Sequence, residues 1–331
     1  MQGFQQIVGH ESVIQHLQNA IESGKVSHAY ILHGEEGSGK KTLAAAFAKT
    51  LQCEEGSRSS CNHCISCMQA DSNNHPDILW VTHEKASIGV DDIRNQVNGD
   101  IQIKPYSRRY KIYIIDSADK LTEAAQNALL KTMEEPPEYA VIILLVNNIN
   151  RLLPTVLSRA VLLSLRPVDK QLIKEFLITR HFVPDYMARL AADFSGGNVG
   201  KAIKYASSEE FEKTKDDVLH ILKYMDDMEI YEIISGIKTI AANKSSIDDY
   251  LDLILLWYRD ILMLKATNDP NLLLYKEEYQ FIKKQANIRS YDEIENIINA
   301  IDKAKLRLRA NVNFDITIEL MLLTIKENSN G

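Results

Sequence analysis

The four cysteines of this chain lie close together and could bind a metal ion. They are Cys53, Cys61, Cys64 and Cys67, in a chain of 331 residues. Closely spaced thiolates can surround Zn²⁺ as a tetrahedron, and a complete set of four leaves no open position for catalysis. We therefore expect a structural Zn²⁺ site whose polar loop, residues 54–60, is ordered by the metal.

Two other roles for these residues are open. His63 could replace one thiolate as a ligand, and Cys61 with Cys64 could form a redox pair. The first residues, MQGFQQIVGHES, carry no basic start and no apolar run, so we expect a cytoplasmic protein. Thiols stay reduced in the cytoplasm, which favours metal binding over disulfides.

A glycine-rich run, GEEGSGKKT at residues 34–42, follows a predicted strand and opens a predicted helix. That context is typical of a P-loop, in which backbone N–H groups surround phosphates and a lysine reaches their oxygens. A glycine-rich turn that binds no ligand is the alternative. The apolar run KIYII is followed by Asp116, where P-loop ATPases place a metal-supporting carboxylate. The candidate nucleotide-binding residues are Gly34, Gly37, Gly39, Lys40, Thr42 and Asp116.

The residue types at two positions indicate that this site cannot use Mg²⁺ for hydrolysis. Lys41 stands directly after the P-loop lysine, where Ser or Thr must ligate the metal. Ser117 follows Asp116 and is a poor general base. Thr42 is rotated about 100° around the helix from the ligand position, and Asp119 has the wrong spacing to replace the base. Binding of ATP or ADP stays open, and intrinsic catalysis is not expected.

These residues need a scaffold, and alternating apolar and amphipathic segments predict one. Through residue 166 the pattern indicates an α/β P-loop domain with a parallel sheet and helices on both faces. Strands are expected at 28–32, 78–82, 111–115, 140–146 and 160–165, and helices at 40–51, 90–97, 122–133 and 153–157. Beyond residue 166 only helices are expected, at 170–180, 183–194, 199–206, 216–225, 247–266 and 291–308.

Several runs of residues resemble the motifs of a known family. They are IVGH at 7–10, SHAY at 27–30, NALLKTMEEPP at 127–137, Asn147–Asn148, LSR at 157–159 and WYRDIL at 257–262. With the P-loop and the cysteines, they are similar to the delta-prime family of bacterial DNA polymerase III clamp-loader subunits, within the AAA+ superfamily. The resemblance covers nearly the whole chain, although Ala160 stands where the family usually has Cys.

The resemblance implies three domains. These are an AAA+ nucleotide-fold domain at 1–166 with a zinc module at 53–67, a helical lid at 167–207 and a helical collar at 208–331. It also implies a hetero-pentamer with motor and delta-type subunits, which acts in DNA replication on the sliding clamp and primer-template DNA, without a membrane. Such a chain holds the ring together and is part of a DNA-directed DNA polymerase holoenzyme, a nucleotidyltransferase.

The resemblance also assigns a role to Arg159. The equivalent arginine of the family reaches the γ-phosphate of ATP on the next subunit, as an arginine finger. An ordinary surface or ion-paired arginine is the alternative. Motor subunits carry a lid arginine, whose place is taken here by Gly200, with Lys201 adjacent. We therefore expect a non-motor subunit, and the alternative is an active motor-type clamp-loader ATPase.

The charge balance gives little support to DNA binding by this chain alone. Its net charge is −7, whereas neutralising phosphates needs clustered lysine and arginine. One basic cluster exists, and we expect it either to contact DNA or to be a solvated loop before the third strand. Its members are Lys104, Arg108, Arg109 and Lys111.

Overall fold

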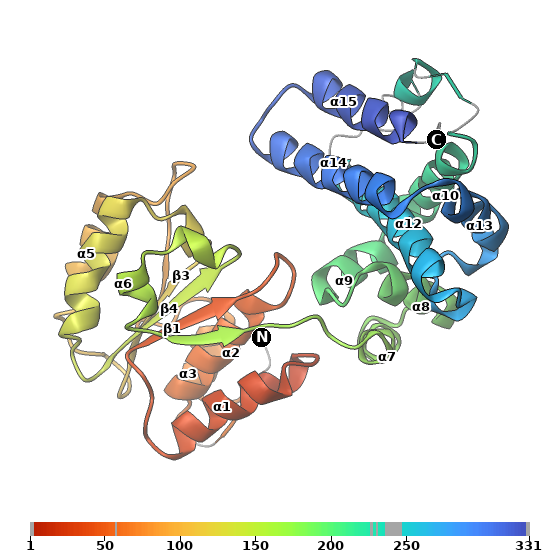
Figure 1. Cartoon of the computed structure of the whole chain (residues 1–331). Helices are drawn as coiled ribbons and strands as arrows, with labels where there is room; N and C mark the ends of the chain where they lie inside the picture. Colours follow the sequence, from red (N-terminus) through yellow and green to blue (C-terminus); the bar gives the residue numbers. More distant parts are fainter. Residues whose placement is uncertain (1–2, 57, 226–227, 230, 236–246, 329–331) are drawn as a thin grey trace. The chain divides into compact units, whose positions relative to one another are not determined.

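The structure is a computed structural model that describes residues 3–56, 58–225, 228–229, 231–235 and 247–328 (Figure 1). The chain divides into two compact units, Met1–Lys204 and Tyr205–Gly331. The first unit contains a β-sheet with helices packed on it, and the described part of the second contains helices. The division into a nucleotide-fold domain, a lid and a collar stays a prediction.

A five-stranded parallel sheet forms the centre of the first unit. Its strands lie in the order β2-β3-β4-β1-β5, and every neighbouring pair is parallel. The strands are β1 (Ala29–His33), β2 (Ile78–Val81), β3 (Lys111–Ile115), β4 (Ala140–Val146) and β5 (Val161–Ser164). Every residue of β4 is buried, as expected for a strand that helices cover on both faces. The predicted parallel α/β fold is confirmed.

Helices cover both faces of this sheet (Figure 1). One face carries α1 (Glu11–Glu22) and α2 (Lys40–Gln52), and the other carries α4 (Val90–Ile93), α5 (Glu123–Glu134) and α6 (Pro154–Leu157). The side chains that these helices bury against the sheet include Leu17, Leu43, Phe47, Ile93, Leu129 and Val156. Burying each such side chain contributes about 1.5–3 kcal/mol, so the two apolar layers hold the helices in place.

The sheet brings the P-loop and the acidic box to one edge. Because all five strands are parallel, their carboxyl ends lie on the same side. Gly34 follows β1, Asp116 follows β3 and Asn147 follows β4. The amide of Gly34 donates to the carbonyl of Val146 at 3.1 Å, which extends the pairing of β1 with β4 into the loop. Residues far apart in the sequence therefore meet where α2 begins.

The rest of the described chain is helical. Its helices are α7 (Lys170–His181), α8 (Asp185–Phe194), α9 (Val199–Ser207), α10 (Glu209–Tyr224), α12 (Ile247–Thr267), α13 (Tyr279–Ile288), α14 (Tyr291–Arg309) and α15 (Phe314–Glu327). In the second unit, the fully buried Trp257 donates its indole N–H to the Gln285 side chain at 3.0 Å. None of the helices in the described ranges has the length and apolar character needed to cross a membrane.

The sequence analysis did not predict α1, α13 or α15, and two segments that it did interpret have a different structure. The sequence predicts one loop around the cysteines, but α3 (Ile65–Asp71) forms there, with Cys64 as its N-cap. The cap is a contact of the folded cysteine cluster, in which the Cys64 sulfur accepts the amide of Cys67. The helix expected at 90–97 is α4 followed by a π turn at Arg94–Asn98.

Candidate nucleotide and metal sites

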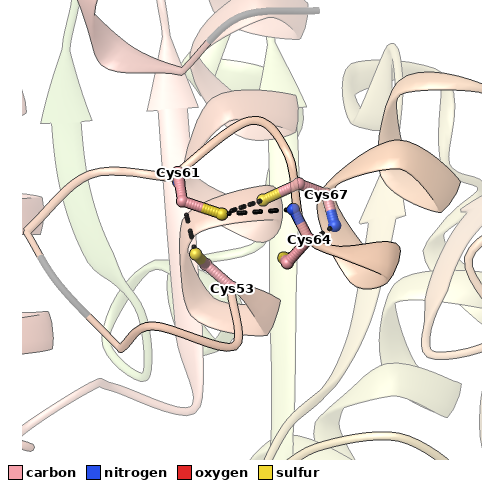
Figure 2. A group of neighbouring side chains, drawn as sticks. All are labelled: Cys53, Cys61, Cys64 and Cys67. Atoms are coloured by element: carbon pink, nitrogen blue, oxygen red, sulfur yellow. Dashed lines mark hydrogen bonds between the residues drawn. The ribbon is translucent and has the colours of Figure 1, made fainter.

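The structure brings the four cysteines into one cluster (Figure 2). Cys53 is the C-cap of α2, Cys61 lies in the loop that follows, and Cys64 and Cys67 are at the start of α3. The four Sγ atoms all lie within 4.8 Å of one another, and those of Cys61 and Cys67 are 3.9 Å apart. A tetrahedral Zn²⁺ with Zn–S bonds of about 2.3 Å separates its sulfurs by about 3.8 Å. The cluster therefore fits the predicted ion.

Backbone amides point at the sulfurs of this cluster. The N–H groups of Cys61, Cys64 and Cys67 donate to the sulfurs of Cys53, Cys61 and Cys64 at 3.3, 3.4 and 3.3 Å. Burial works against ionisation of Cys64, but hydrogen bonds outweigh it and lower its pKa to about 7. Burial raises the pKa of Cys67. A bound dication would keep all four sulfurs deprotonated together, because the thiolate is the metal-binding form.

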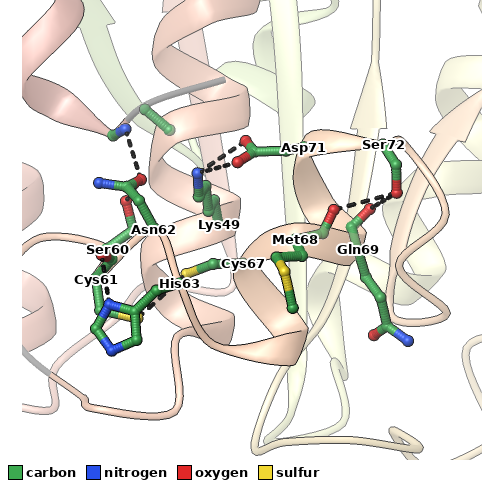
Figure 3. A network of polar contacts seen from close by, with 12 residues as sticks. Lys49, Ser60, Cys61, Asn62, His63, Cys67, Met68, Gln69, Asp71 and Ser72 are labelled. Atoms are coloured by element: carbon green, nitrogen blue, oxygen red, sulfur yellow. Dashed lines mark hydrogen bonds and ion pairs between the residues drawn. The ribbon is translucent and has the colours of Figure 1, made fainter.

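A partly buried ion pair ties the cysteine module to α2 (Figure 3). The Lys49 ammonium lies 2.7 and 2.6 Å from the two carboxylate oxygens of Asp71. Lys49 is 1% exposed, in α2, and Asp71 is the last residue of α3. Replacing Asp71 by Ala would take a carboxylate away from this buried ammonium, which is destabilising. We did not single out either residue from the sequence, where a lysine and an aspartate in separate helices carry no pairing signal.

His63, the alternative ligand, contacts a carboxylate. Its Nε2 lies 2.8 Å from Oε1 of Glu55, and its Nδ1 lies 3.0 Å from the carbonyl oxygen of Cys61. The side chain is 73% exposed. Both ring nitrogens have polar neighbours of their own, which favours the four-sulfur set over a set that includes this histidine.

The run at 34–42 forms a phosphate-type loop between β1 and α2. Gly37 and Gly39 have φ angles of 82° and 96°, in the left-handed region that glycine enters without steric cost. The Lys40 ammonium donates to two carbonyls of the loop at 2.7 and 2.6 Å, and to Oδ1 of Asn147 at 2.8 Å. Burial lowers the pKa of Lys40, and nearby carboxylates, first among them that of Asp116, oppose this effect.

Lys41 pairs with the acidic box. Its Nζ lies 2.7 Å from Oδ2 of Asp116, and the two side chains are 68% and 33% exposed. P-loop ATPases use this carboxylate to support Mg²⁺, but here it holds an ammonium. Lys41 also occupies the position at which a P-loop ATPase carries the Ser or Thr whose hydroxyl ligates Mg²⁺. The residues at the site therefore do not fit a Mg²⁺ ion.

Asp119 takes part in the backbone structure of the site. One of its carboxylate oxygens accepts the amide of Asn147 at 3.0 Å, directly after β4. Ser117 stands between the two aspartates with a φ of 51°, in a left-handed turn. The turn and the hydrogen bond together indicate that Asp119 stabilises the backbone here. It is not placed as a base that orients water.

A cavity lies beside the P-loop and has a volume of about 480 Å³. Residues 6–8, Gly39 and Thr42 contribute one part of its wall, and Phe176 and Ile203 contribute another. Small-molecule sites commonly have volumes of about 300–1,000 Å³ and largely apolar walls. The cavity is therefore large enough for the base and sugar of a nucleotide whose phosphates lie in the loop.

The turn before α9 and the first residues of α9 lie against the P-loop. The side-chain amide of Asn198 donates to the carbonyl of Glu36 at 2.7 Å, and the amide of Gly200 donates to the carbonyl of Gly37 at 2.9 Å. A Cβ atom at position 200 would lie 2.7 Å from Cα of Gly37. This close approach leaves no room for a side chain at position 200.

Replacing Gly200 by Ala is expected to destabilise the first unit. The added methyl group would meet the backbone of Gly37, and such overpacking costs about 1–3 kcal/mol. Thermal unfolding of the purified chain, followed by circular dichroism, should show a lower melting temperature. Gly89→Ala is the matched control, because a Cβ there has its nearest neighbour at 3.5 Å and its φ is −86°. Equal melting temperatures for the two variants would contradict the prediction.

Arg159 lies at the surface, just after α6. Its guanidinium is 2.9 Å from Oε1 of Glu134, and the arginine side chain is 36% exposed. It also donates to the carbonyl of Thr155 at 3.0 Å, and it lines an open hollow with Ser27 and Ala160. Exposed ion pairs contribute about 0–1 kcal/mol, so Arg159 can exchange Glu134 for a more strongly charged anion at little cost. The sequence motifs did not point to Glu134 as its partner.

The basic cluster before β3 does not form one solvated patch. Lys111 is 1% exposed, and its ammonium lies 2.7 Å from a carboxylate oxygen of Asp100. The prediction that Lys111 belongs to the exposed cluster is therefore wrong, because the first residue of β3 lies under the loop that carries Asp100. Arg108 donates to a backbone carbonyl of the cysteine module at 2.9 Å. Lys104 and Arg109 are exposed.

Comparisons with known proteins give matches over nearly the full length of the chain. A family model described as DNA polymerase III, delta subunit, matches residues 9–169. The DNA polymerase III subunit delta' of Bacillus subtilis (strain 168) is 31% identical over 318 residues, which span 95% of this chain and 95% of that protein. DNA polymerase III subunit tau of the same organism is 35% identical over 173 residues, 52% of this chain and 30% of that protein.

A solved structure with a similar description also aligns with this chain. It is a DNA polymerase III gamma subunit-related protein of Thermotoga maritima, with 21% sequence identity and a TM-score of 0.45. The alignment covers 96% of this chain and 99% of that one. Among the sequence relatives, the match to delta' covers 95% of this chain and so includes parts of both compact units, whereas the match to tau covers 52%.

Proposed function

The chain belongs to the delta' family of DNA polymerase III clamp-loader subunits, and on that premise we propose that it is a non-motor subunit of the loader. In this role it holds a pentameric ring of loader subunits together and donates Arg159 to the ATP site of a neighbour. The observation that carries the proposal is the ion pair between Lys41 and Asp116. It places a lysine ammonium on the carboxylate with which a motor subunit would hold Mg²⁺.

Two further features of the same site support the non-motor role. Ser117 stands where the resembled motor subunits carry the water-orienting glutamate, and Asp119 is engaged by the amide of Asn147. Gly200 packs on the P-loop at a distance that excludes the lid arginine. Lys41, Ser117 and Gly200 thus each replace a residue that a motor subunit needs for ATP hydrolysis. A motor subunit could not tolerate all three replacements.

The surface position of Arg159 supports its action on a neighbour. The guanidinium is held by an exposed ion pair and by the carbonyl of Thr155, so it can turn outward without breaking a buried contact. A guanidinium placed beside a γ-phosphate stabilises the charge that develops during phosphoryl transfer. The neighbouring motor subunits supply the nucleotide, and the sliding clamp and primer-template DNA interact with the assembly as a whole.

The four cysteines are proposed to hold Zn²⁺ in a structural site. Their sulfurs have tetrahedral spacing and accept backbone hydrogen bonds. Zinc in such a site supplies folding free energy and no chemistry, because four thiolates complete its coordination. The ion pair between Lys49 and Asp71 would transmit this order from the module to α2.

Steady-state ATP hydrolysis tests the non-motor role. The purified chain loaded with zinc, with Mg²⁺ and primed DNA, is expected to show only background turnover. The same chain, added to motor and delta-type subunits, is expected to be required for rapid hydrolysis and clamp loading. Turnover by the isolated chain that Lys40→Ala abolishes would instead identify it as an active motor-type ATPase.

A further inference from the structure

The ion pair at the P-loop supplies a positive charge as well as blocking a metal ligand. In P-loop ATPases, Mg²⁺ lies between the strand-end carboxylate and the β- and γ-phosphates and neutralises their charge. Here the Lys41 ammonium lies 2.7 Å from that carboxylate, on Asp116. We propose that Lys41 replaces the metal, and that this site binds a nucleoside polyphosphate without a divalent cation.

The geometry of Lys41 suits such a bridge. An ammonium has three N–H donors, and the contact with Asp116 uses one of them. The Lys41 side chain is 68% exposed, so its other donors face solvent beside the loop. A lysine ammonium binds phosphate as a point charge and needs no fixed orientation. The same side chain can therefore contact the carboxylate and a phosphate oxygen together, as Mg²⁺ does in an active site.

The loop itself keeps the features that bind phosphate. Gly37 and Gly39 have left-handed φ angles, and the thirteen-residue helix α2 begins directly after them, so its N-terminal amides face the loop. Within the residues that the structure describes, the buried Ser38 hydroxyl has no hydrogen-bond partner. Such a group costs free energy unless something satisfies it, and a phosphate oxygen in the loop would do so.

The cavity beside the loop accounts for the rest of the ligand. Val8, Phe176 and Ile203 give it apolar surfaces, and Arg180 adds a positive charge. Lys41 then faces the phosphates, and Lys40 would join it once a phosphate oxygen replaces one of the three acceptors that its ammonium now contacts. The pair of Lys41 with Asp116 is neutral, whereas Mg²⁺ on the same carboxylate would leave one positive charge. The site therefore holds nucleotide with less positive charge than a motor site and without the metal that hydrolysis requires. This inference does not depend on whether Arg159 acts on a neighbour.

Titration with a fluorescent ADP analogue, with and without excess MgCl₂, tests this proposal. The full-length chain is loaded with zinc, and the metal-free buffer contains no chelator, because a chelator would strip the cysteines. Mg²⁺ is expected not to tighten binding by the wild-type chain. Lys41→Thr restores a hydroxyl ligand and frees Asp116, so its binding should become about tenfold tighter when Mg²⁺ is added.

Two control variants make the outcome decisive. Lys120→Thr removes the same charge from an exposed position near Asp116, and it should behave like the wild type. Lys40→Ala should lose binding under both conditions, which assigns the ligand to the P-loop. The proposal is overturned if Mg²⁺ tightens binding by the wild-type chain about tenfold. It is equally overturned if a chain with an unchanged melting temperature binds no nucleotide in either buffer.

Discussion

Replacing Arg159 by Ala is expected to slow ATP hydrolysis at the neighbouring site by about a thousandfold or more. The guanidinium would stabilise charge on the transferring phosphoryl group, and alanine offers no donor to replace it. The measurement is single-turnover hydrolysis by a rebuilt loader in which only the motor subunit facing Arg159 keeps its P-loop lysine. That design isolates one site, so that hydrolysis elsewhere in the ring does not mask the loss.

Three further variants separate a role in the neighbour's site from a structural one. Arg151→Ala removes an exposed arginine from the nearby 3-10 turn, and it should leave the rate unchanged. Arg159→Lys keeps the charge but loses the planar fork, so it should restore only part of the rate. Glu134→Gln removes the ion-pair partner and should not slow hydrolysis. A rate for Arg159→Ala equal to that of Arg151→Ala would contradict the arginine-finger role.

Removing zinc is expected to unfold the cysteine module and to lower the melting temperature of the chain by about 10 °C. The reason is linkage, because free zinc at about 1,000 times its Kd stabilises the folded state by about 4 kcal/mol. Cys61→Ser should produce most of the same loss, because it leaves three thiolates. Hydrogen exchange should show lost protection at residues 58–72, while the sheet strands stay protected.

The matched control for the metal site is His63→Ala. This residue lies inside the cysteine stretch, but its ring contacts Glu55 and the carbonyl of Cys61. The variant should therefore retain one zinc per chain, measured by elemental analysis, and should melt like the wild type. A chain that binds no zinc at all, or a His63→Ala variant that loses it, would mean that the four sulfurs are not the ligand set.

The roles of some residues could be predicted from the sequence alone, because those roles depend on residues nearby in the chain. β4 was predicted at its observed bounds because seven consecutive apolar residues are typical of a strand buried on both faces. The P-loop was predicted because its glycines and Lys40 belong to one short run. The cysteine cluster was also predicted, because thiols with these spacings can meet in a single loop. In each case the information lies within about fifteen residues, the range over which local geometry constrains a chain.

The pairs that give these residues their roles were decided only by tertiary structure. The sequence showed that Lys41 stands where a metal-ligating Ser or Thr is missing. Its contact with Asp116, however, depends on the packing of α2 beside the end of β3. The exclusion of a side chain at Gly200 depends on the start of α9, which packs against Gly37 of the P-loop.

Lys111 was predicted either to contact DNA or to lie in a solvated loop, and it is instead buried against Asp100. A lysine has the same local sequence signal whether it faces water or a carboxylate brought from elsewhere in the fold. The sequence by itself therefore determined which chemical groups this protein carries and which elements hold them. The tertiary structure decided which charges neutralise one another, because that depends on how distant segments pack.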